Sequence, residues 1–417
     1  MPNADDAAAE DAARLARELA ANAVDSLPEG ALAARIAAAS AEGRPLRVKL
    51  GIDPTAPDIH LGHTVVLRKL REFQDAGHLV VLIVGDYTAR VGDPSGRSTL
   101  RPMLSEAEIE ANAATFHTQA LKVLDGDAAR LEVRRNSEWL DMPMIELLEL
   151  LRTSTAAQML ERDDFAKRFA AREPISMLEL LYPLLQGYDS VAVRADVELG
   201  GTDQKFNLLL GRDIQRAYGV PEQAILTMPI LVGTDGQRKM SKSLGNQIGV
   251  TDPPEEMYGR AMAIPDEAMA DYRRLLLDAP GSASAHAGGA GPARPLDGRS
   301  ARDAKRALAR GIVAWLHSDA EAEAAERNFE RVHVEHAEPE DIPDARIAPS
   351  DGNVHLPGLI AAEFGVSRSE ARRLIDGGAV TLGGEQLGEG EHDVPTQRAD
   401  GQVLKVGRRR FRRIRVD

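Results

Sequence analysis

Residues 51–70, GIDPTAPDIHLGHTVVLRKL, give the clearest indication of the fold. They continue a short apolar run, RVKLGI at residues 47–52, which has the composition of a buried strand. A proline-marked turn follows, and the apolar spacing after residue 60 is that of an amphipathic helix. We therefore expect His60 and His63 at a helix N-terminus. Free backbone N–H groups and the helix dipole make a helix N-terminus suitable for binding a phosphate. Gly62 allows a ligand to come close.

Similar apolar runs recur along the chain. They are LVVLIVG at 79–85, RLEVRRN at 130–136, ADVELGG at 195–201 and AILTMPI at 224–230. Helical stretches separate them. Strands that alternate with helices predict an α/β fold, with a Rossmann-like, doubly wound parallel sheet covered on both faces. Ligands of such sheets bind at the carboxyl ends of the strands.

Length and composition favour a globular protein of two or three domains, with 417 residues, 43% of them apolar and 28% charged. The net charge of −14 argues against indiscriminate coating of nucleic acid, so any RNA contact must be local. The lack of cysteine excludes disulfides and Cys-ligated zinc. An acidic, helical N-terminal stretch without signal-peptide features, and apolar runs far shorter than a membrane helix, lead us to expect a cytoplasmic protein without membrane contact.

A second glycine-rich stretch, GTDGQRKMSKSLGNQIG at residues 233–249, carries Lys239 and Lys242 with hydroxyls at Ser241 and Ser243. Such a loop can close over a polyphosphate. Taken separately, the two stretches also fit a pair of surface imidazoles and a solvated basic turn. HLGH followed by KMSKS, each after a predicted strand, resembles the paired nucleotide-binding signatures of class I aminoacyl-tRNA synthetases.

The residues between these signatures resemble bacterial tyrosyl-tRNA synthetases of the subgroup with a VKLG sequence. The matching segments are GDPSG at 92–96, YPLLQGYD at 182–189 and GGTDQ at 200–204. The spacing i, i+4, i+7 places Tyr182, Gln186 and Asp189 on one face of a helix. The resemblance implies that Asp93, Tyr182 and Gln186 hold the tyrosine ammonium and that Asp189 accepts the phenolic proton. Buried ammonium and phenol groups need such acceptors.

Lys49 is a departure from the family pattern. It stands where many members carry a tyrosine that also contacts the substrate phenol. We include Lys49 among the tyrosine-binding residues as a secondary contact.

The resemblance implies a reaction in two steps, in which the tyrosine carboxylate attacks the ATP α-phosphate and a tRNA ribose hydroxyl then takes the tyrosyl group. Positioning and charge stabilisation with Mg²⁺ suffice for such a transfer, and no protein-ligated metal is expected. The residues expected at the polyphosphate are Thr55, His60, Arg97, Lys239 and Lys242. His63 is expected at the nucleoside end. The residues expected at ATP or the adenylate are Gly51, Asp53, Gly62, Gly201, Asp203, Gln204, Met240 and Ser241, with Asp203 at the ribose.

The chain is expected to have five parts: an N-terminal helical lead-in (1–45), the catalytic domain (46–250), an α-helical domain (251–335) with a flexible insertion at 278–298, a linker (336–353) and a small α+β domain (354–417). The last part resembles the S4-type RNA-binding domain. Its basic residues indicate an electrostatic footprint for RNA phosphates, with a solvated basic tail as the alternative, and the resemblance implies tRNA(Tyr) as the partner. They are Arg368, Arg372 and Arg373 beside Ser367, and Arg408, Arg409, Arg410, Arg412, Arg413 and Arg415.

Three other interpretations compete with this one. A tryptophanyl-tRNA synthetase would share the class but gives no reason for an acceptor like Asp189. A non-catalytic RNA-binding protein leaves HLGH and KMSKS unexplained, and a nucleotidylyltransferase of the same fold leaves the basic C-terminal part unexplained. The resemblance also implies a homodimer, for which MIELLELL at residues 144–151 is a candidate interface, although a buried core explains that segment equally well.

Overall fold

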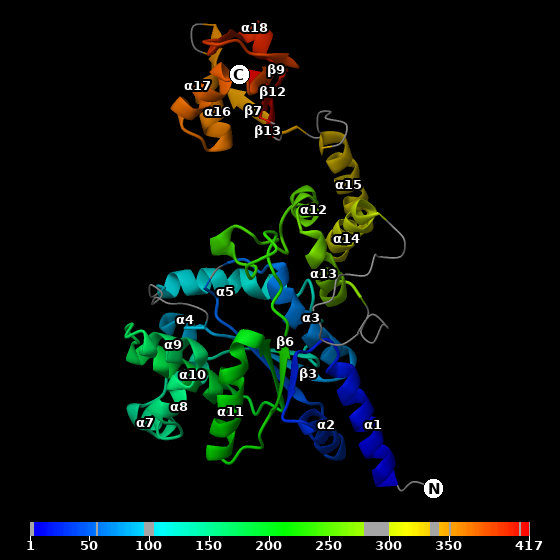
Figure 1. The fold of residues 1–417 in the computed structure, drawn as a ribbon, viewed down its shortest axis with the longest axis vertical. Helices are drawn as coiled ribbons and strands as arrows, with labels where there is room; N and C mark the ends of the chain where they lie inside the picture. The colour runs from blue at the N-terminus through cyan, green and yellow to red at the C-terminus, as the bar shows by residue number, and fades with distance from the viewer. Residues whose placement is uncertain are drawn as a thin grey trace. The chain divides into compact units, whose positions relative to one another are not determined.

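The computed structural model describes residues 4–55, 57–95, 104–278, 300–333, 342–349, 352–407 and 410–416. The chain divides into two compact units, Met1–Ala322 and Glu323–Asp417, and the boundary falls within helix α15 (Asp319–His333). The first unit contains a six-stranded sheet and the second a five-stranded sheet (Figure 1). Four predicted features lie outside the described residues: Arg97, Arg408, Arg409 and the insertion beyond Asp278.

The sheet of the first unit has the strand order β1-β6-β5-β2-β3-β4. Its strands are β1 (Asp25–Leu27), β2 (Arg47–Ile52), β3 (Leu79–Val84), β4 (Leu131–Arg135), β5 (Val197–Gly201) and β6 (Ala224–Met228). The last five are the strands predicted from the apolar runs, and they pair in parallel. The order runs outward in both directions from the neighbouring strands β2 and β5, as in a doubly wound fold.

Strand β1 was not predicted and pairs antiparallel with β6 at the edge of the sheet. The prediction of a purely helical lead-in at 1–45 is therefore wrong at this point. Three residues are too few to show a strand period. The segment is held instead by tertiary contacts of Asp25, whose carboxylate accepts hydrogen bonds from Lys205 Nζ at 2.7 Å and Thr227 Oγ1 at 2.6 Å.

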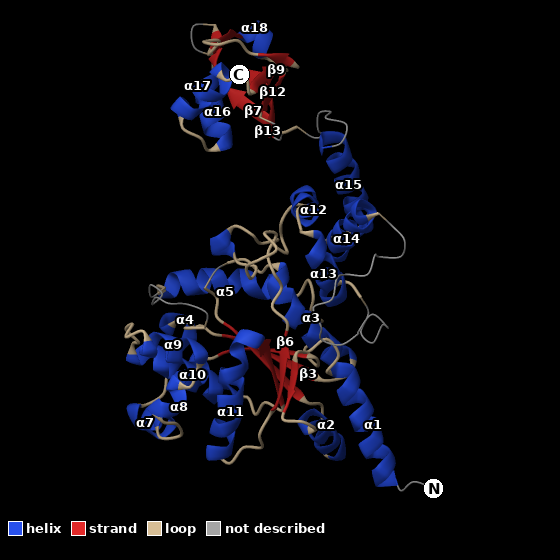
Figure 2. Ribbon diagram, viewed as in Figure 1, coloured by secondary structure: helices blue, strands red, loops and turns tan. Residues whose placement is uncertain are grey.

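Helices cover both faces of this sheet (Figure 2), with α3 on one side and the α10–α11 pair on the other. The helices before β5 are α1 (Ala4–Leu19), α2 (Ala31–Ala41), α3 (Leu61–Asp75), α4 (Thr88–Val91), α5 (Glu106–Ala120), α6 (Ser137–Leu140), α7 (Met144–Leu151), α8 (Ala156–Leu160), α9 (Asp163–Ala170) and α10 (Met177–Ala192). Helix α11 (Lys205–Ala217) follows β5. Helices α10 and α11 pack closely because glycines face each other, and a Cβ on Gly187 would lie 3.2 Å from Gly211 Cα.

The later helices do not form a separate domain as predicted for 251–335. They are α12 (Pro254–Met262), α13 (Met269–Leu276), α14 (Ala301–Leu316) and α15, and up to Ala322 they belong to the first unit. Direct contacts explain this. Tyr272 donates from its hydroxyl to the Val232 carbonyl at 2.6 Å, and the guanidinium of Arg68 on α3 lies 5.4 Å from the centre of the Trp315 ring.

Besides the end of α15, the described part of the second unit combines short strands with three helices. Its sheet has the order β10-β9-β12-β13-β7, and β8 pairs with β11. The strands are β7 (Asp344–Ile347), β8 (Asn353–His355), β9 (Val380–Leu382), β10 (Glu385–Gln386), β11 (Asp393–Pro395), β12 (Val403–Val406) and β13 (Arg410–Val416). The helices that follow β7 are α16 (Leu356–Phe364), α17 (Arg368–Asp376) and α18 (Thr396–Ala399).

Strand β7 corrects the prediction of a linker at 336–353. It pairs in parallel with β13, and Ala345 is fully buried in the core of the unit. The surrounding prolines and acidic residues are typical of a linker, and four residues are too short a run to outweigh them. Among the described residues, none of the helices is long and apolar enough to cross a membrane.

Candidate active site

A cavity of about 710 Å³ opens at the carboxyl ends of the central strands of the first unit. It lies where β2 and β5 meet, the place at which a doubly wound sheet binds its ligands. Most of the predicted site residues line it. They are Gly51, Asp53, Thr55, His60, Gly62, His63, Asp93, Tyr182, Gln186, Asp189, Gly201, Asp203, Gln204, Lys239, Met240, Ser241 and Lys242.

The HLGH turn forms the capped N-terminus of α3. The Nδ1 atom of His60 accepts a hydrogen bond from the Gly62 N–H at 3.2 Å, and Nδ1 of His63 accepts one from the His60 N–H at 3.3 Å. The two rings stack with centroids 3.9 Å apart. A Cβ on Gly62 would lie 3.0 Å from the His60 ring, so the turn needs glycine. Because each Nδ1 accepts, each Nε2 carries the ring proton and is left as a donor.

Both imidazoles are neutral at physiological pH. Burial lowers the pKa of His60 to about 2, and the neighbouring His63 ring and the charge of Lys239 lower it in the same direction. Burial and Lys239 lower the pKa of His63 to about 4. The histidines therefore contribute hydrogen-bond donors to the cavity, while its positive charge comes from lysines.

The KMSKS loop is joined directly to the HLGH turn. Leu61 N–H donates to the Ile248 carbonyl and Val250 N–H to the Ile59 carbonyl, both at 2.9 Å. At the base of the loop, buried Asn246 accepts from the Ser241 N–H at 2.8 Å. These bonds bring two distant sequence motifs to one end of the cavity.

The two lysines of this loop form ion pairs with carboxylates at the mouth of the cavity. Lys239 Nζ lies 3.3 Å from Asp203 Oδ2, and Lys242 pairs with Asp58. Both ammonium groups remain about half exposed. An anionic ligand can therefore reach them in exchange for a carboxylate.

Among the described residues, no group of three His, Cys, Asp or Glu side chains is placed to hold a metal ion.

Tyr182 and Asp53 are joined in the middle of the cavity. The Tyr182 hydroxyl donates to Asp53 Oδ2 at 2.9 Å, and Thr88 Oγ1 donates to Asp53 Oδ1 at 2.6 Å. Burial, with the nearby charges of Asp53 and Asp93, keeps the pKa of Tyr182 well above its ordinary value. Tyr182 is therefore a neutral phenol whose oxygen retains lone pairs for a further donor.

Hydrogen-bond acceptors gather next to this pair. Asp93 Oδ2 accepts from Gln204 Nε2 at 3.0 Å, and Gln186 Oε1 accepts from Asn207 Nδ2 at 2.8 Å. These bonds orient the Asp93 carboxylate and the Gln186 amide oxygen. Both groups line the cavity and have capacity for another donor, such as an ammonium.

Asp189 lies at the buried end of the cavity, with 3% of its surface exposed. Its Oδ1 accepts from Trp139 Nε1 at 2.8 Å, and Asn136 Nδ2 lies 3.5 Å from its Oδ2. Burial raises the pKa of Asp189 to about 7, even though the charge of Lys49 and the two donors lower it. A carboxylate in this position, with capacity for one more donor, can recognise a hydroxyl group at the end of a ligand.

Lys49 does not line the cavity, contrary to the prediction of a direct contact with tyrosine. It is fully buried, and its ammonium donates to Gln186 O at 2.9 Å and Ser190 Oγ at 2.8 Å and pairs with Glu198 Oε1 at 2.7 Å. A lysine has three N–H donors, and all three are used here. No donor remains for a ligand.

Asp58 and Asn246 were not predicted from the sequence, and neither were four residues that contact Asp53, Gln186 or Asp189. Thr88 and Asn136 follow the carboxyl ends of β3 and β4, a position that marks ligand-facing residues in such sheets and supplied a usable signal. Trp139 and Asn207 act through contacts with Asp189 and Gln186. Only the packing of helices α6 and α11 against α10 brings them there, and the sequence carries no local mark of it.

Comparison with known proteins identifies the family. The family model "tRNA synthetases class I (W and Y)" matches residues 41–333. The tyrosine–tRNA ligase of Moorella thermoacetica is 50% identical over 97% of this chain and 96% of its own length. That of Thermotoga maritima is 49% identical over 94% and 95%. The chain belongs to the bacterial tyrosine–tRNA ligases of class I.

Solved structures of this family share the fold of the first unit. The Aspergillus nidulans mitochondrial tyrosyl-tRNA synthetase, C-terminally truncated, has a TM-score of 0.60 at 22% identity and covers 77% of this chain and 98% of its own. The Archaeoglobus fulgidus tyrosyl-tRNA synthetase complexed with L-tyrosine has a TM-score of 0.58 at 24% identity and covers 76% and 99%. At these identities the likeness concerns the fold alone.

The contact between Trp139 and Asp189 allows the carboxyl group to be titrated by fluorescence. The chain has two tryptophans, so a Trp315→Phe variant reports on Trp139 alone. Because the pKa of Asp189 is raised to about 7, the group is protonated below that pH and ionised above it. We expect the emission of Trp139 to change with a midpoint near pH 7 and to be flat in Trp315→Phe/Asp189→Asn. A midpoint near pH 4 would contradict the site as described.

Proposed function

We propose that the chain activates L-tyrosine with magnesium-bound ATP and transfers the tyrosyl group to tRNA(Tyr) in the cytoplasm. The observation that carries this is one cavity with two chemically different ends. Joined HLGH and KMSKS segments supply lysines and imidazole N–H groups at its mouth, and the buried Asp189 supplies an acceptor at its inner end. Pyrophosphate exchange with each of the twenty amino acids, followed by tRNA charging, tests the proposal.

Tyrosine is held by acceptors along the cavity in this proposal. Asp189 accepts the phenol O–H, and the carboxylate of Asp93 with the oxygens of Gln186 and Tyr182 accepts the ammonium. Each of these groups is already oriented by a protein donor or acceptor, which lowers the cost of ordering it on binding. The tyrosine carboxylate then points toward the end of the cavity that carries HLGH and KMSKS.

ATP is held at that end. The Nε2–H groups of His60 and His63 are free donors on neutral rings, and Thr55 lines the same wall. Lys239 and Lys242 exchange their carboxylate partners for phosphate oxygens, which releases Asp203 for the ribose hydroxyls. Gly51, Gly62 and Gly201 allow the nucleotide to approach the backbone. Arg97 remains a sequence-based prediction for the polyphosphate.

The in-line attack needs no protein nucleophile. The tyrosine carboxylate oxygen forms a bond to the α-phosphorus, and the bond from that phosphorus to the bridging oxygen breaks and releases pyrophosphate. The two lysines are placed to balance the charge that develops on the leaving group. Such preorganised donors act on the rate of the step more than on binding of the ground state.

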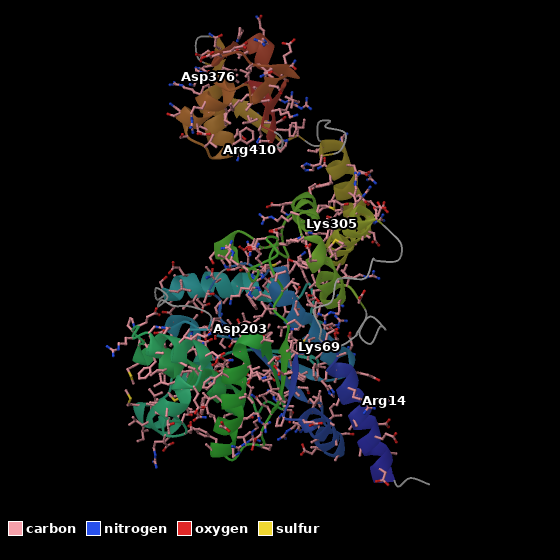
Figure 3. All side chains as sticks on the ribbon, in the orientation of Figure 1. Arg14, Lys69, Asp203, Lys305, Asp376 and Arg410 are labelled. Carbon is pink, nitrogen blue, oxygen red and sulfur yellow. The ribbon has the colours of Figure 1, made fainter. Side chains whose placement is uncertain are left out.

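The second unit is the proposed tRNA-binding part, of S4 type. Arg368, Arg372 and Arg373 lie exposed on α17, and Arg410 (labelled in Figure 3) lies exposed at the start of β13. Arg412 and Arg415 pair with Glu363 and Asp344, so they belong to the unit's own structure as well. The exposed group provides local positive charge in an acidic chain.

An apolar patch supports a homodimer as the assembled form. On α7, Met144, Ile145 and Leu148 are 68%, 64% and 48% exposed. Phe169 on α9 and Met177 on α10 are 65% and 80% exposed. Large contiguous apolar patches mark interaction sites. The family resemblance assigns this one to a second copy of the chain, because a two-fold interface uses the same patch twice.

The role of the KMSKS loop predicts the effect of Lys242→Ala. Loss of one charge-stabilising donor costs on the order of a hundredfold in rate, so adenylate formation should slow by about that factor while tyrosine affinity stays unchanged. Single-turnover kinetics of adenylation measure both quantities. A near-normal rate with weakened tyrosine binding would make the loop a clamp on the amino acid and reverse the roles assigned above.

The tRNA assignment predicts the effect of replacing Arg368, Arg372 and Arg410 together by alanine. tRNA affinity should fall and lose salt dependence, with a slope smaller by about one for each phosphate contact removed. Tyrosyl-adenylate formation should not change. Arg398→Ala is the matched control, because Arg398 pairs with Glu391 on the same unit. Equal loss of adenylation and charging in the triple variant would show that the unit supports catalysis instead.

The dimer assignment predicts that Ile145→Asp/Leu148→Asp yields a monomer in sedimentation velocity. Two carboxylates in the centre of an apolar interface leave buried charges without partners. Val24→Asp, at a residue 58% exposed and away from the patch, should remain dimeric. A wild-type chain that sediments as a monomer at micromolar concentration would refute the interface.

A further inference from the structure

A buried ion pair lies at the centre of the sheet, beneath the cavity. Lys49 on β2 and Glu198 on β5 are partners in the parallel register, and they are 0% and 1% exposed. Their charged atoms, Nζ and Oε1, are 2.7 Å apart. Neither side chain lines the cavity. The charges of this pair therefore act on the site from below, without touching a ligand.

The pair is fastened to α10, the helix that carries the amino-acid site. Lys49 donates to the Gln186 carbonyl and to Ser190 Oγ, and Ser190 Oγ donates to Glu198 Oε2 at 3.1 Å. Gln223 donates to the same carboxylate. A Cβ on Gly211 would lie 3.3 Å from Glu198 Oε2, so the neighbouring helix leaves little space there. Both charges are thus fixed in position and shielded from solvent.

The charged and titratable groups around Asp189 come from several elements. Lys49 and Glu198 lie on the two central strands, and Asp53 follows β2. Asn136 and Trp139 contribute neutral donors from the β4–α6 segment, and Tyr182 on α10 is a neutral phenol. Of these, Lys49 lowers the pKa of Asp189 most strongly after burial has raised it, and Glu198 raises it. Lys49 is the cation that opposes the burial.

We propose that Lys49 is a positioning residue that keeps Asp189 in its ionised, accepting form, and that Glu198 and Ser190 hold Lys49 for this purpose. The proposal rests on the proposed function, in which Asp189 accepts the phenol hydroxyl of tyrosine. It gives the lysine at this position an indirect role in place of a direct contact. A well-packed apolar pair would support a fold equally well, so support of the fold alone does not explain a buried ion pair at this place.

The test titrates Trp139 emission in the Trp315→Phe background, without any ligand. Lys49→Met should raise the midpoint, by on the order of one pH unit, because a nearby opposite charge favours the ionised form of a carboxyl group. Glu198→Gln should lower the midpoint, because it leaves the lysine charge unopposed. The double variant Lys49→Met/Glu198→Gln should fall between wild type and Lys49→Met. Unchanged midpoints in all folded variants would overturn the proposal.

The test remains decisive if Lys49→Met does not fold, and one further variant serves as its control. If Lys49→Met fails to fold, Glu198→Gln and the double variant, which leaves no buried charge at the pair, still decide the question by the direction of their midpoints. Lys69→Met is the matched control, because Lys69 (labelled in Figure 3) is also a buried lysine, 1% exposed, and pairs with Glu72 on α3. It should lower the melting temperature and leave the midpoint where it is.

Tyrosine binding at pH 7 separates this inference from the proposed function. Lys49→Met should weaken tyrosine binding about as far as the ionised fraction of Asp189 falls, roughly fivefold, and adjusting the pH to 8 should restore most of it. A wild-type chain that does not bind tyrosine would refute the proposed function. Normal tyrosine binding by wild type, with variant midpoints that do not move, would refute the role of Lys49 alone.

Discussion

The parallel pairing of β2 with β5 fixes the position of both the cavity and the buried ion pair beneath it. The strand order runs outward from this pair, so the loops that leave the two strands separate and open the crevice that holds the site. The same pairing places Lys49 beside Glu198 where no water reaches. Removing one partner of such a pair costs about 3–5 kcal/mol, so these positions tolerate little change on their own.

The cavity above this pair carries groups of opposite charge at its two ends. Its inner end has an acceptor, Asp189, whose charge depends on a lysine that the ligand does not touch. Its mouth has Lys239 and Lys242, each paired with a carboxylate that a phosphate can displace. The stacked imidazoles of His60 and His63 are neutral and serve as hydrogen-bond donors. An acidic chain can therefore bind a highly anionic nucleotide, because cations are concentrated where the phosphates lie.

Much of the fold was predictable because its signals are local. Five strands of the first sheet come from runs of five or six strand-forming residues between helices, and the HLGH and KMSKS segments carry residue types that few structural roles require together. The edge strands β1 and β7 were not predictable, since three or four residues show no period and are held by distant partners. Lys49 was identified from the sequence as a residue of the amino-acid site, but the direct contact predicted for it was wrong. The direction of its side chain depends on contacts with Glu198, Ser190 and Gln186, which only the assembled sheet and α10 bring together.

The most direct test of the account is the ratio of kcat/KM for tyrosine to that for phenylalanine in adenylate formation, compared between wild type and Asp189→Ala. The two substrates differ by the hydroxyl that Asp189 is proposed to accept. Loss of a hydrogen bond to a charged group costs about 1.5–3 kcal/mol, so the ratio should fall roughly tenfold or more, through the tyrosine value alone. An unchanged ratio, or an equal loss with both amino acids, would contradict the account.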